Sequence, residues 1–224
     1  MTHHSDAGVV ANERLTALSS SALLVALILI LATTPNVPAL LLPHVFIGVL
    51  LAGPLAVKLA SVGYRFARYY TGSQSYVAKG PPRLALRLLA PFLVAVTIVL
   101  MVSGLALLAT GPDDPGPFVA LHNIAFIFWL PLFAVHALAY ARRAFNATGR
   151  DMGTIAESVR GRGLRLSATG IALLLGSVAG AALLPGAVPW TVPGVLSQQL
   201  PAPVLVGSLV TLLTWTAIRP KRWS

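Results

Sequence analysis

The chain has 224 residues, of which 56% are apolar and only 10% are charged, and it carries a formal net charge of +10. Soluble globular domains average about 25% charged residues, so this composition excludes an ordinary soluble domain and predicts an integral membrane protein. No cysteine is present, which excludes disulfides, cysteine-ligated iron–sulfur clusters and the covalent attachment of c-type haem.

Six apolar stretches are candidates for crossing a bilayer, which takes roughly 20 mainly apolar residues. We expect the first to be an uncleaved span rather than a signal peptide, because Asp6 and Glu13 precede it and no small-residue cleavage site follows. The sixth is the shortest. In chain order the stretches are 18–34, 45–64, 86–109, 118–141, 166–184 and 204–218.

The basic residues predict the orientation of these spans. Apart from Arg14 and Lys58, they gather in three groups: Arg65, Arg68, Lys79, Arg83 and Arg87; Arg142, Arg143, Arg150, Arg160, Arg162 and Arg165; and Arg219, Lys221 and Arg222. The alternate loops hold no lysine or arginine, only Asp113 and Asp114. By the positive-inside rule, we expect a multi-pass protein of the plasma membrane with both termini cytoplasmic. The positive charge then faces the lipid bilayer, and no nucleic acid is expected as a partner.

These observations predict an all-α, polytopic transmembrane bundle with six spans. The expected parts are a cytoplasmic tail (1–17), a four-helix core suited to a cofactor (18–141), a basic cytoplasmic loop (142–165), a transmembrane hairpin (166–218) and a second cytoplasmic tail (219–224). Tyr69, Tyr70 and Tyr76 are expected to be interfacial anchors. The GSVAG motif at residues 176–180 indicates a place where helices approach closely.

Three histidines lie within or beside the spans, where ionisable residues are costly and indicate a functional site. His122 and His136 are fourteen positions apart on the fourth span, so an ideal helix places them about 40° apart around its axis and about 21 Å apart along it. His44 begins the second span, which runs parallel to the fourth, and is expected to lie level with His122. Two facing imidazoles can supply the axial ligands of a low-spin haem, with Gly48 helping the plate to fit between helices.

This pattern resembles the cytochrome b type of di-haem four-helix bundle and, more loosely, the cytochrome b561 and ferric-reductase-like membrane families. In the cytochrome b pattern both ligand helices carry two histidines. His122 and His136 match on the fourth span, but the second span matches only at His44, because Lys58 stands where the other histidine is expected. Residues 43–140 also resemble an uncharacterised group of actinobacterial integral membrane proteins. The resemblance implies one haem b. It also implies that a second haem or a quinone could bind near His136.

Other interpretations of these residues stay open. Lys58 can extend its ammonium group to the cytoplasmic interface, pair with a haem propionate or quinone oxygen, ligate iron as a neutral amine, or serve helix packing. Histidines at these positions can also be hydrogen-bonded to headgroups, water or a neighbouring helix. Trp129, Phe126 and Phe133 lie on or near the helix face that carries His122 and His136, and we interpret them as packing residues.

The expected function is a membrane b-type haem protein that moves electrons across or within the bilayer. No dinucleotide-binding motif is apparent, so the electrons are expected to come from quinol or a redox partner protein. If the protein is part of an enzyme, this chain is expected to be the membrane cytochrome subunit of an oxidoreductase. The alternatives are a cofactor-free transporter with a polar path through His44, His122, His136 and Lys58, and a membrane anchor or assembly protein. The oligomeric state is not predicted.

Overall fold

The computed structural model describes residues 3–81, 84–153, 161–196, 209 and 211–212. The regular secondary structure in these ranges is helical, and they contain no strand. The all-α class is therefore confirmed for the described part of the chain. The helices divide into two compact units, each of which is described by itself below.

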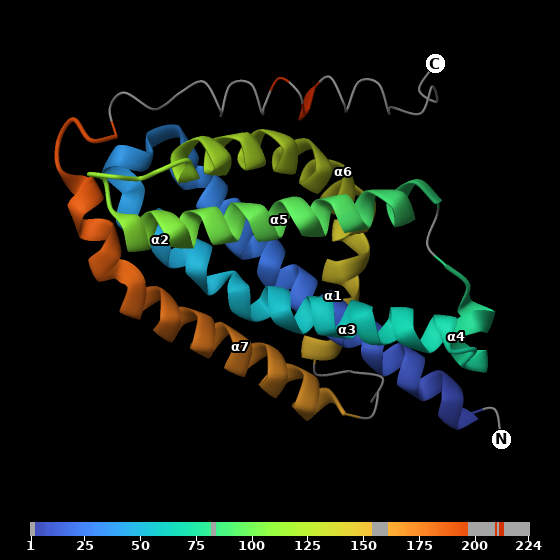
Figure 1. Ribbon diagram of the computed structural model, residues 1–224. Coiled ribbons are helices and arrows are strands. Elements are labelled where there is room, and N and C mark those ends of the chain that lie inside the picture. The colour runs from blue at the N-terminus through green and yellow to red at the C-terminus, as the bar shows by residue number, and fades with distance from the viewer. Residues whose placement is uncertain (1–2, 82–83, 154–160, 197–208, 210, 213–224) are drawn as a thin grey trace, which may run out of the picture. The chain divides into compact units, whose positions relative to one another are not determined.

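Most of the described chain lies in seven α-helices and two 3₁₀ segments (Figure 1). In chain order they are α1 (His3–Thr33), η1 (Thr34–Asn36), α2 (Val37–Leu50), α3 (Ala52–Tyr70), α4 (Gln74–Lys79), α5 (Leu84–Thr110), α6 (Phe118–Met152), α7 (Arg162–Leu183) and η2 (Leu184–Thr191).

Several predicted spans agree with these helices to within a few residues, but two helices are longer than their spans. Helix α1 begins at His3, so most of the predicted tail 1–17 is helical, and α6 continues to Met152, inside the predicted loop 142–165. Hydropathy marks only the apolar part of a helix, whereas the helix itself continues until a capping signal or a helix breaker ends it. The sixth predicted span, 204–218, lies outside the described residues except for residues 209 and 211–212.

The first unit consists of Met1–Ile30, Phe46–Arg83 and Tyr140–Ala182. Within it α1 and α3 run antiparallel, as their contacts show. Asn12 of α1 donates from Nδ2 to the carbonyl oxygen of Ser61 at 3.2 Å, while Leu23 and Ala26 cluster with Leu51, which comes earlier in the chain than Ser61. The apolar chain therefore doubles back between α1 and α3.

Helix α7 packs through glycines against the segment that contains the end of α2 and the start of α3. A Cβ atom added to Gly176 would overlap the carbonyl oxygen of Leu50, and one added to Gly180 would lie 2.9 Å from that of Phe46. In the reciprocal approach, a Cβ atom added to Gly53 would overlap the carbonyl oxygen of Ala172. The close helix approach predicted from the GSVAG motif is confirmed, and it occurs within the chain.

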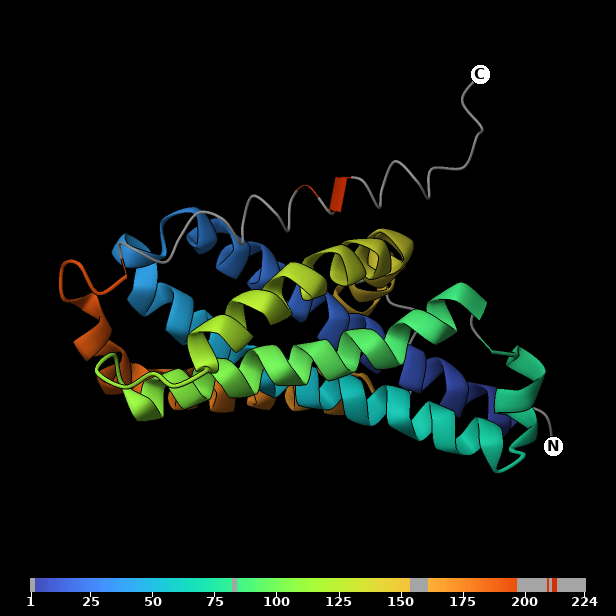
Figure 2. The ribbon, with the colours of Figure 1, turned by 45° about the horizontal axis from the view of Figure 1, so that its top comes forward.

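The second unit consists of Leu31–Val45, Leu84–Ala139 and Leu183–Ser224. Here α5 and the first part of α6 are antiparallel neighbours (Figure 2). Ser103 contacts His122 at one level, and Trp129 donates to Thr97 at another. The η2 segment covers one end of α5, where Nε1 of Trp190 donates to the Leu107 carbonyl oxygen at 3.2 Å.

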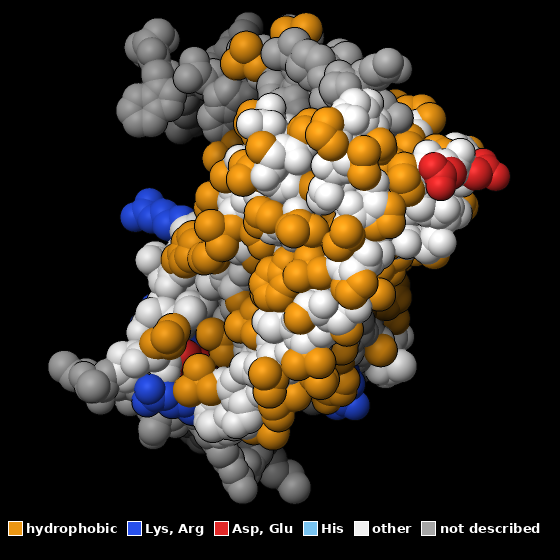
Figure 3. Space-filling view, turned by 90° about the vertical axis from the view of Figure 1, so that its left-hand side faces the viewer, with side chains coloured by type: hydrophobic (Ala, Val, Ile, Leu, Met, Phe, Trp, Pro, Cys, Tyr) orange, Lys and Arg blue, Asp and Glu red, His pale blue; other side chains and the backbone are white. Residues whose placement is uncertain are grey.

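Large apolar side chains are exposed on the surface. Leu174, Leu175 and Val178 of α7 are each at least 60% exposed, and Figure 3 shows hydrophobic side chains covering much of one face. Soluble monomers rarely expose large contiguous apolar patches. Four described segments are long and apolar enough to cross a membrane: Ala7–Tyr70, Leu84–Thr110, Phe118–Met152 and Arg162–Thr191. These findings confirm the prediction of transmembrane helices, while the number of six spans stays a prediction.

Candidate functional site

His44 lies on α2 beside the turn that joins this helix to α1. The helix is interrupted at Leu40 (φ −116°, ψ 23°), one turn before Pro43, whose ring removes a backbone donor and crowds the preceding turn. Across the turn, Oγ1 of Thr33 lies 2.7 Å from Nδ1 of His44. This hydroxyl at the end of α1 therefore holds the imidazole through one of its two nitrogens.

His122 has a similar partner on α5. Its Nδ1 lies 3.1 Å from Oγ of Ser103, a residue with no exposed surface. The next residue, Gly104, makes room for the ring, because a Cβ atom there would lie 3.2 Å from Cε1 of His122. Two successive residues of α5 therefore accommodate one edge of this imidazole.

His44 and His122 belong to the same unit, the second. Both rings are half-buried, and both use Nδ1 for a hydroxyl contact. Their Nε2 atoms take no part in these two contacts. The structure places in one unit the two residues that the sequence pattern paired, and it adds Thr33 and Ser103, which sequence reasoning had missed. Serine and threonine are common in membrane helices, so only the fold could select these two.

The other two predicted site residues, His136 and Lys58, belong to different units. His136 lies on the part of α6 that belongs to the second unit, with a buried Nδ1 atom. Lys58 lies on α3 in the first unit and is half-buried. The two residues therefore belong to different units, and their pairing stays a prediction.

Trp129 occupies the stripe of α6 between His122 and His136. Its ring stacks on Phe133 with centroids 4.6 Å apart and planes 6° apart, and Phe126 lies on its other side along the helix at 6.4 Å. The indole Nε1 donates to Oγ1 of Thr97 at 3.0 Å. A buried indole with a satisfied donor and aromatic neighbours is a packing element, in agreement with the interpretation favoured from the sequence.

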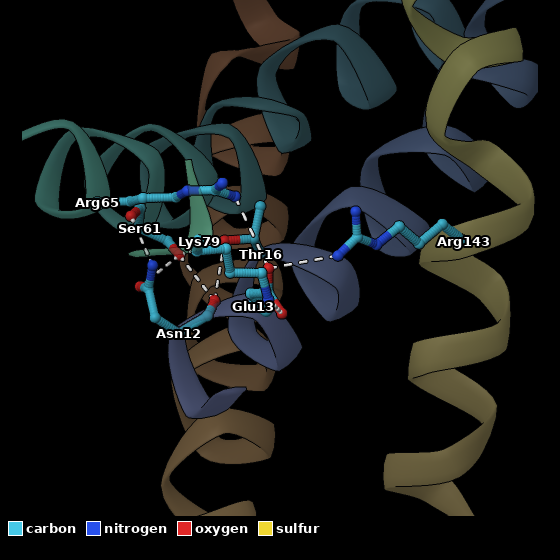
Figure 4. A network of polar contacts seen from close by, with 7 residues as sticks. All are labelled: Asn12, Glu13, Thr16, Ser61, Arg65, Lys79 and Arg143. Atoms are coloured by element: carbon cyan, nitrogen blue, oxygen red, sulfur yellow. Dashed lines mark hydrogen bonds and ion pairs between the residues drawn. The ribbon is translucent and has the colours of Figure 1, made fainter. Parts of the chain in front are cut away.

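A polar cluster that sequence reasoning had missed lies in the first unit (Figure 4). Glu13 of α1 pairs with Lys79 of α4, with Arg143 of α6 (Nη2 to Oε1, 3.3 Å) and with Arg65 of α3 (Nη1 to Oε1, 3.8 Å). The Arg143 side chain is 68% exposed, and exposed ion pairs contribute little stability. This cluster connects α1, α3, α4 and α6. It also pairs Arg65, a residue of the kind that can neutralise a propionate, with Glu13.

Next to Glu13, hydroxyl and amide groups join α1 to α3. The Oγ atom of Ser61 donates to Oδ1 of Asn12 at 2.9 Å and contacts Oγ1 of Thr16 (Figure 4). Ser61 is buried, and small polar residues of this kind hydrogen-bond helices together inside membranes. The cluster therefore has a sufficient structural role in helix packing.

Tyr76 lies on α4 beside the same cluster, with its ring edge-to-face against Tyr64 at 6.0 Å. Burial raises the pKa of the Tyr76 phenol, the Tyr64 phenol and Glu13 act in the same direction, and Arg68 and Arg65 oppose the shift. The phenol is therefore neutral at physiological pH. Tyr76 is buried, and its predicted role as an interfacial anchor stays a prediction.

The donor set limits what the histidines can bind. Across residues 3–81, 84–153, 161–196, 209 and 211–212, no group of three or more histidine or acidic side chains is arranged to hold a metal ion. Two imidazoles alone are a poor site for a bare ion, since protein sites for zinc and similar metals use at least three side-chain ligands. They suit a macrocycle that brings its own equatorial nitrogens.

Comparison with known proteins does not extend these observations, because no protein-family model, curated protein or solved structure matches the chain.

Proposed function

We propose that this chain is a membrane-embedded b-type haem protein that carries electrons, with His44 and His122 as the axial ligands of one haem. The observation that carries the proposal is that both imidazoles lie in the second unit, each with a hydroxyl at its Nδ1 atom. Each is held by a hydroxyl at Nδ1, which leaves Nε2 as the nitrogen suited to bind iron. Ligand histidines in proteins are oriented in this way by a partner at the other ring nitrogen.

The second unit also contains apolar residues of the kind that line a haem pocket. Leu41 and Trp190 form an apolar cluster in the same unit, with Val37 and Val45 packed beside it. An apolar shell of this kind restricts solvent and tunes a redox potential. Gly48, by contrast, does not open a slot for the plate, because its Cβ position faces Cδ1 of Ile30 at 3.3 Å. The glycine that serves the site is Gly104, beside the His122 ring.

A bound haem would supply reversible one-electron transfer at this position. The chain itself would hold both rings through the Thr33 and Ser103 hydroxyls. Electrons would come from quinol or a redox partner protein, which makes the chain the membrane cytochrome subunit of an oxidoreductase. His136, fourteen positions along α6, is the proposed residue for a second haem or a quinone, with Lys58 as a further candidate.

The proposal includes the six-span topology. Ala7–Tyr70 has 64 residues, which as a continuous helix would be about 96 Å long at 1.5 Å per residue, far more than a bilayer core of about 30 Å. Because α1 and α3 are antiparallel within the first unit, this segment accounts for two crossings. The other three segments and 204–218 complete the six.

The test is an absorption spectrum of the purified, haem-supplemented protein, dithionite-reduced minus oxidised. Bis-imidazole haem gives an α band at roughly 560 nm. Replacing His122 by alanine should remove the haem that gives this band. Replacing His3 and His4 together is the matched control, since they lie outside the apolar segments, and should leave the band unchanged.

The same measurement separates the alternatives. A folded protein with a flat spectrum would contradict the haem proposal and favour a cofactor-free transporter or an anchor protein. A band that persists at full height in the His122 variant would show that the ligands lie elsewhere. Loss of part of the signal on replacing His136 would indicate the second haem.

A further inference from the structure

Ser103 makes two contacts that bear on the direction of its hydrogen bonds. Its Oγ atom donates to the carbonyl oxygen of Leu100 at 3.0 Å, and it lies 3.1 Å from Nδ1 of His122. A hydroxyl has a single hydrogen, and a carbonyl oxygen can only accept. With the hydroxyl hydrogen directed at Leu100, the oxygen presents a lone pair to the ring. The Nδ1 atom of His122 must then be the donor.

We infer that Ser103 is the positioning residue of His122 and holds its imidazole in the tautomer with hydrogen on Nδ1 and the lone pair on Nε2. This is the form in which a neutral histidine binds a metal through Nε2. The importance of the tautomer for haem rests on the proposed function, whereas the tautomer itself does not.

Gly104 and the burial of Ser103 support this assignment. The Cβ position of Gly104 lies 3.2 Å from Cε1 and 3.5 Å from Nδ1 of His122, so the ring edge that carries Nδ1 packs on α5. Ser103 has no exposed surface, so water does not compete for its lone pair. A flip of the ring about χ2 would put Cδ2 in place of Nδ1 and break the contact with Ser103.

The first experiment measures the tautomer directly, by nitrogen NMR of the protein labelled with ¹⁵N-histidine and prepared without added haem. The His122→Ala variant identifies the His122 signals. We expect a protonated Nδ1 and an unprotonated Nε2 in the parent protein, and a mixture of tautomers in Ser103→Ala. Thr110→Ala is the matched control, because the Thr110 hydroxyl makes the same kind of bond to a carbonyl of α5, that of Ala106, but is exposed.

The second experiment uses the haem-loaded protein. Loss of the acceptor makes His122 a less basic ligand, so Ser103→Ala should raise the midpoint potential and weaken haem binding by roughly 10- to 100-fold, the usual effect of removing a partner of a ligand histidine. Thr110→Ala should change neither quantity. A purely structural role for Ser103 would lower thermal stability without moving the potential.

The outcomes distinguish the two proposals. A hydrogen on Nε2 of His122 in the parent protein would overturn the inference, as would an unchanged tautomer and potential in Ser103→Ala. The expected tautomer in a protein that binds no haem would support the inference and contradict the proposed function.

Discussion

Asp151 is the residue on which two buried arginines converge in the first unit. Its Oδ1 atom accepts from Nη1 of Arg14 at 3.1 Å, and its Oδ2 atom accepts from Nε of Arg165 at 2.9 Å. The side chains of all three are less than 10% exposed. Buried charges persist only where geometry and hydrogen bonds compensate their desolvation. Asp151 therefore joins α1, α6 and α7 at a place where the sequence indicated a solvated basic loop.

Replacing Asp151 by asparagine should destabilise the protein strongly, because the substitution removes the carboxylate that both guanidinium groups share. Breaking a buried ion pair costs about 3–5 kcal/mol. The measurement is thermal unfolding in detergent, followed by circular dichroism. Asp113→Asn is the control, since Asp113 is exposed and should give an unchanged transition. Equal transitions for both variants would show that the buried ion pairs contribute no net stability.

At the scale of the element, α7 is distinguished by which of its glycines face another helix. Gly176 and Gly180 lie against backbone carbonyls of Leu50 and Phe46, whereas Gly170 has no atom within 4 Å of its Cβ position. Membrane helices associate largely through close van der Waals packing, which small residues allow. The contact between α7 and α2 therefore depends on Gly176 and Gly180 and not on the glycine content of α7 as a whole.

Two alanine substitutions on α7 should consequently have opposite effects. At Gly176 the new methyl group meets a backbone carbonyl that cannot rotate away, so we expect a loss of about 1–3 kcal/mol, as for overpacked cores. At Gly170 alanine only improves helix propensity, by about 0.5–1 kcal/mol. Unfolding of both variants in the same detergent checks this. A stabilised Gly176→Ala protein would contradict the observed packing.

For the whole molecule, the proposed topology of six spans can be tested directly. Four apolar segments are described, and the first contains two antiparallel arms. With the predicted span 204–218, the count is six, which returns the C-terminus to the side of α4. Because the chain has no cysteine, single cysteines can report the side of each loop without background.

We expect Gln74→Cys and Ser224→Cys to react with a membrane-impermeant maleimide only in inverted vesicles, and Asp113→Cys to react in intact cells. Gln74 and Asp113 are exposed, so each should label readily once its side is accessible. Labelling of Ser224→Cys from outside the cell would leave an odd number of spans and contradict the predicted topology. Activity is not needed for this measurement.

Composition and hydropathy were sufficient to predict a helical membrane protein, because a bilayer admits few backbone structures and requires long apolar segments. They also located α5, α7 and the start of α6 to within a few residues. They did not locate the start of α1 or the end of α6, where polar turns continue the helix beyond the apolar stretch.

The sequence by itself determined which residues are unusual in a membrane: His44, His122, His136 and Lys58. Only the tertiary structure decided what surrounds them, because a hydroxyl partner is selected by helix packing and not by spacing along the chain. It placed Thr33 beside His44 and Ser103 beside His122, residues separated by 11 and 19 positions. Helix periodicity relates residues on one helix, whereas these contacts join different helices.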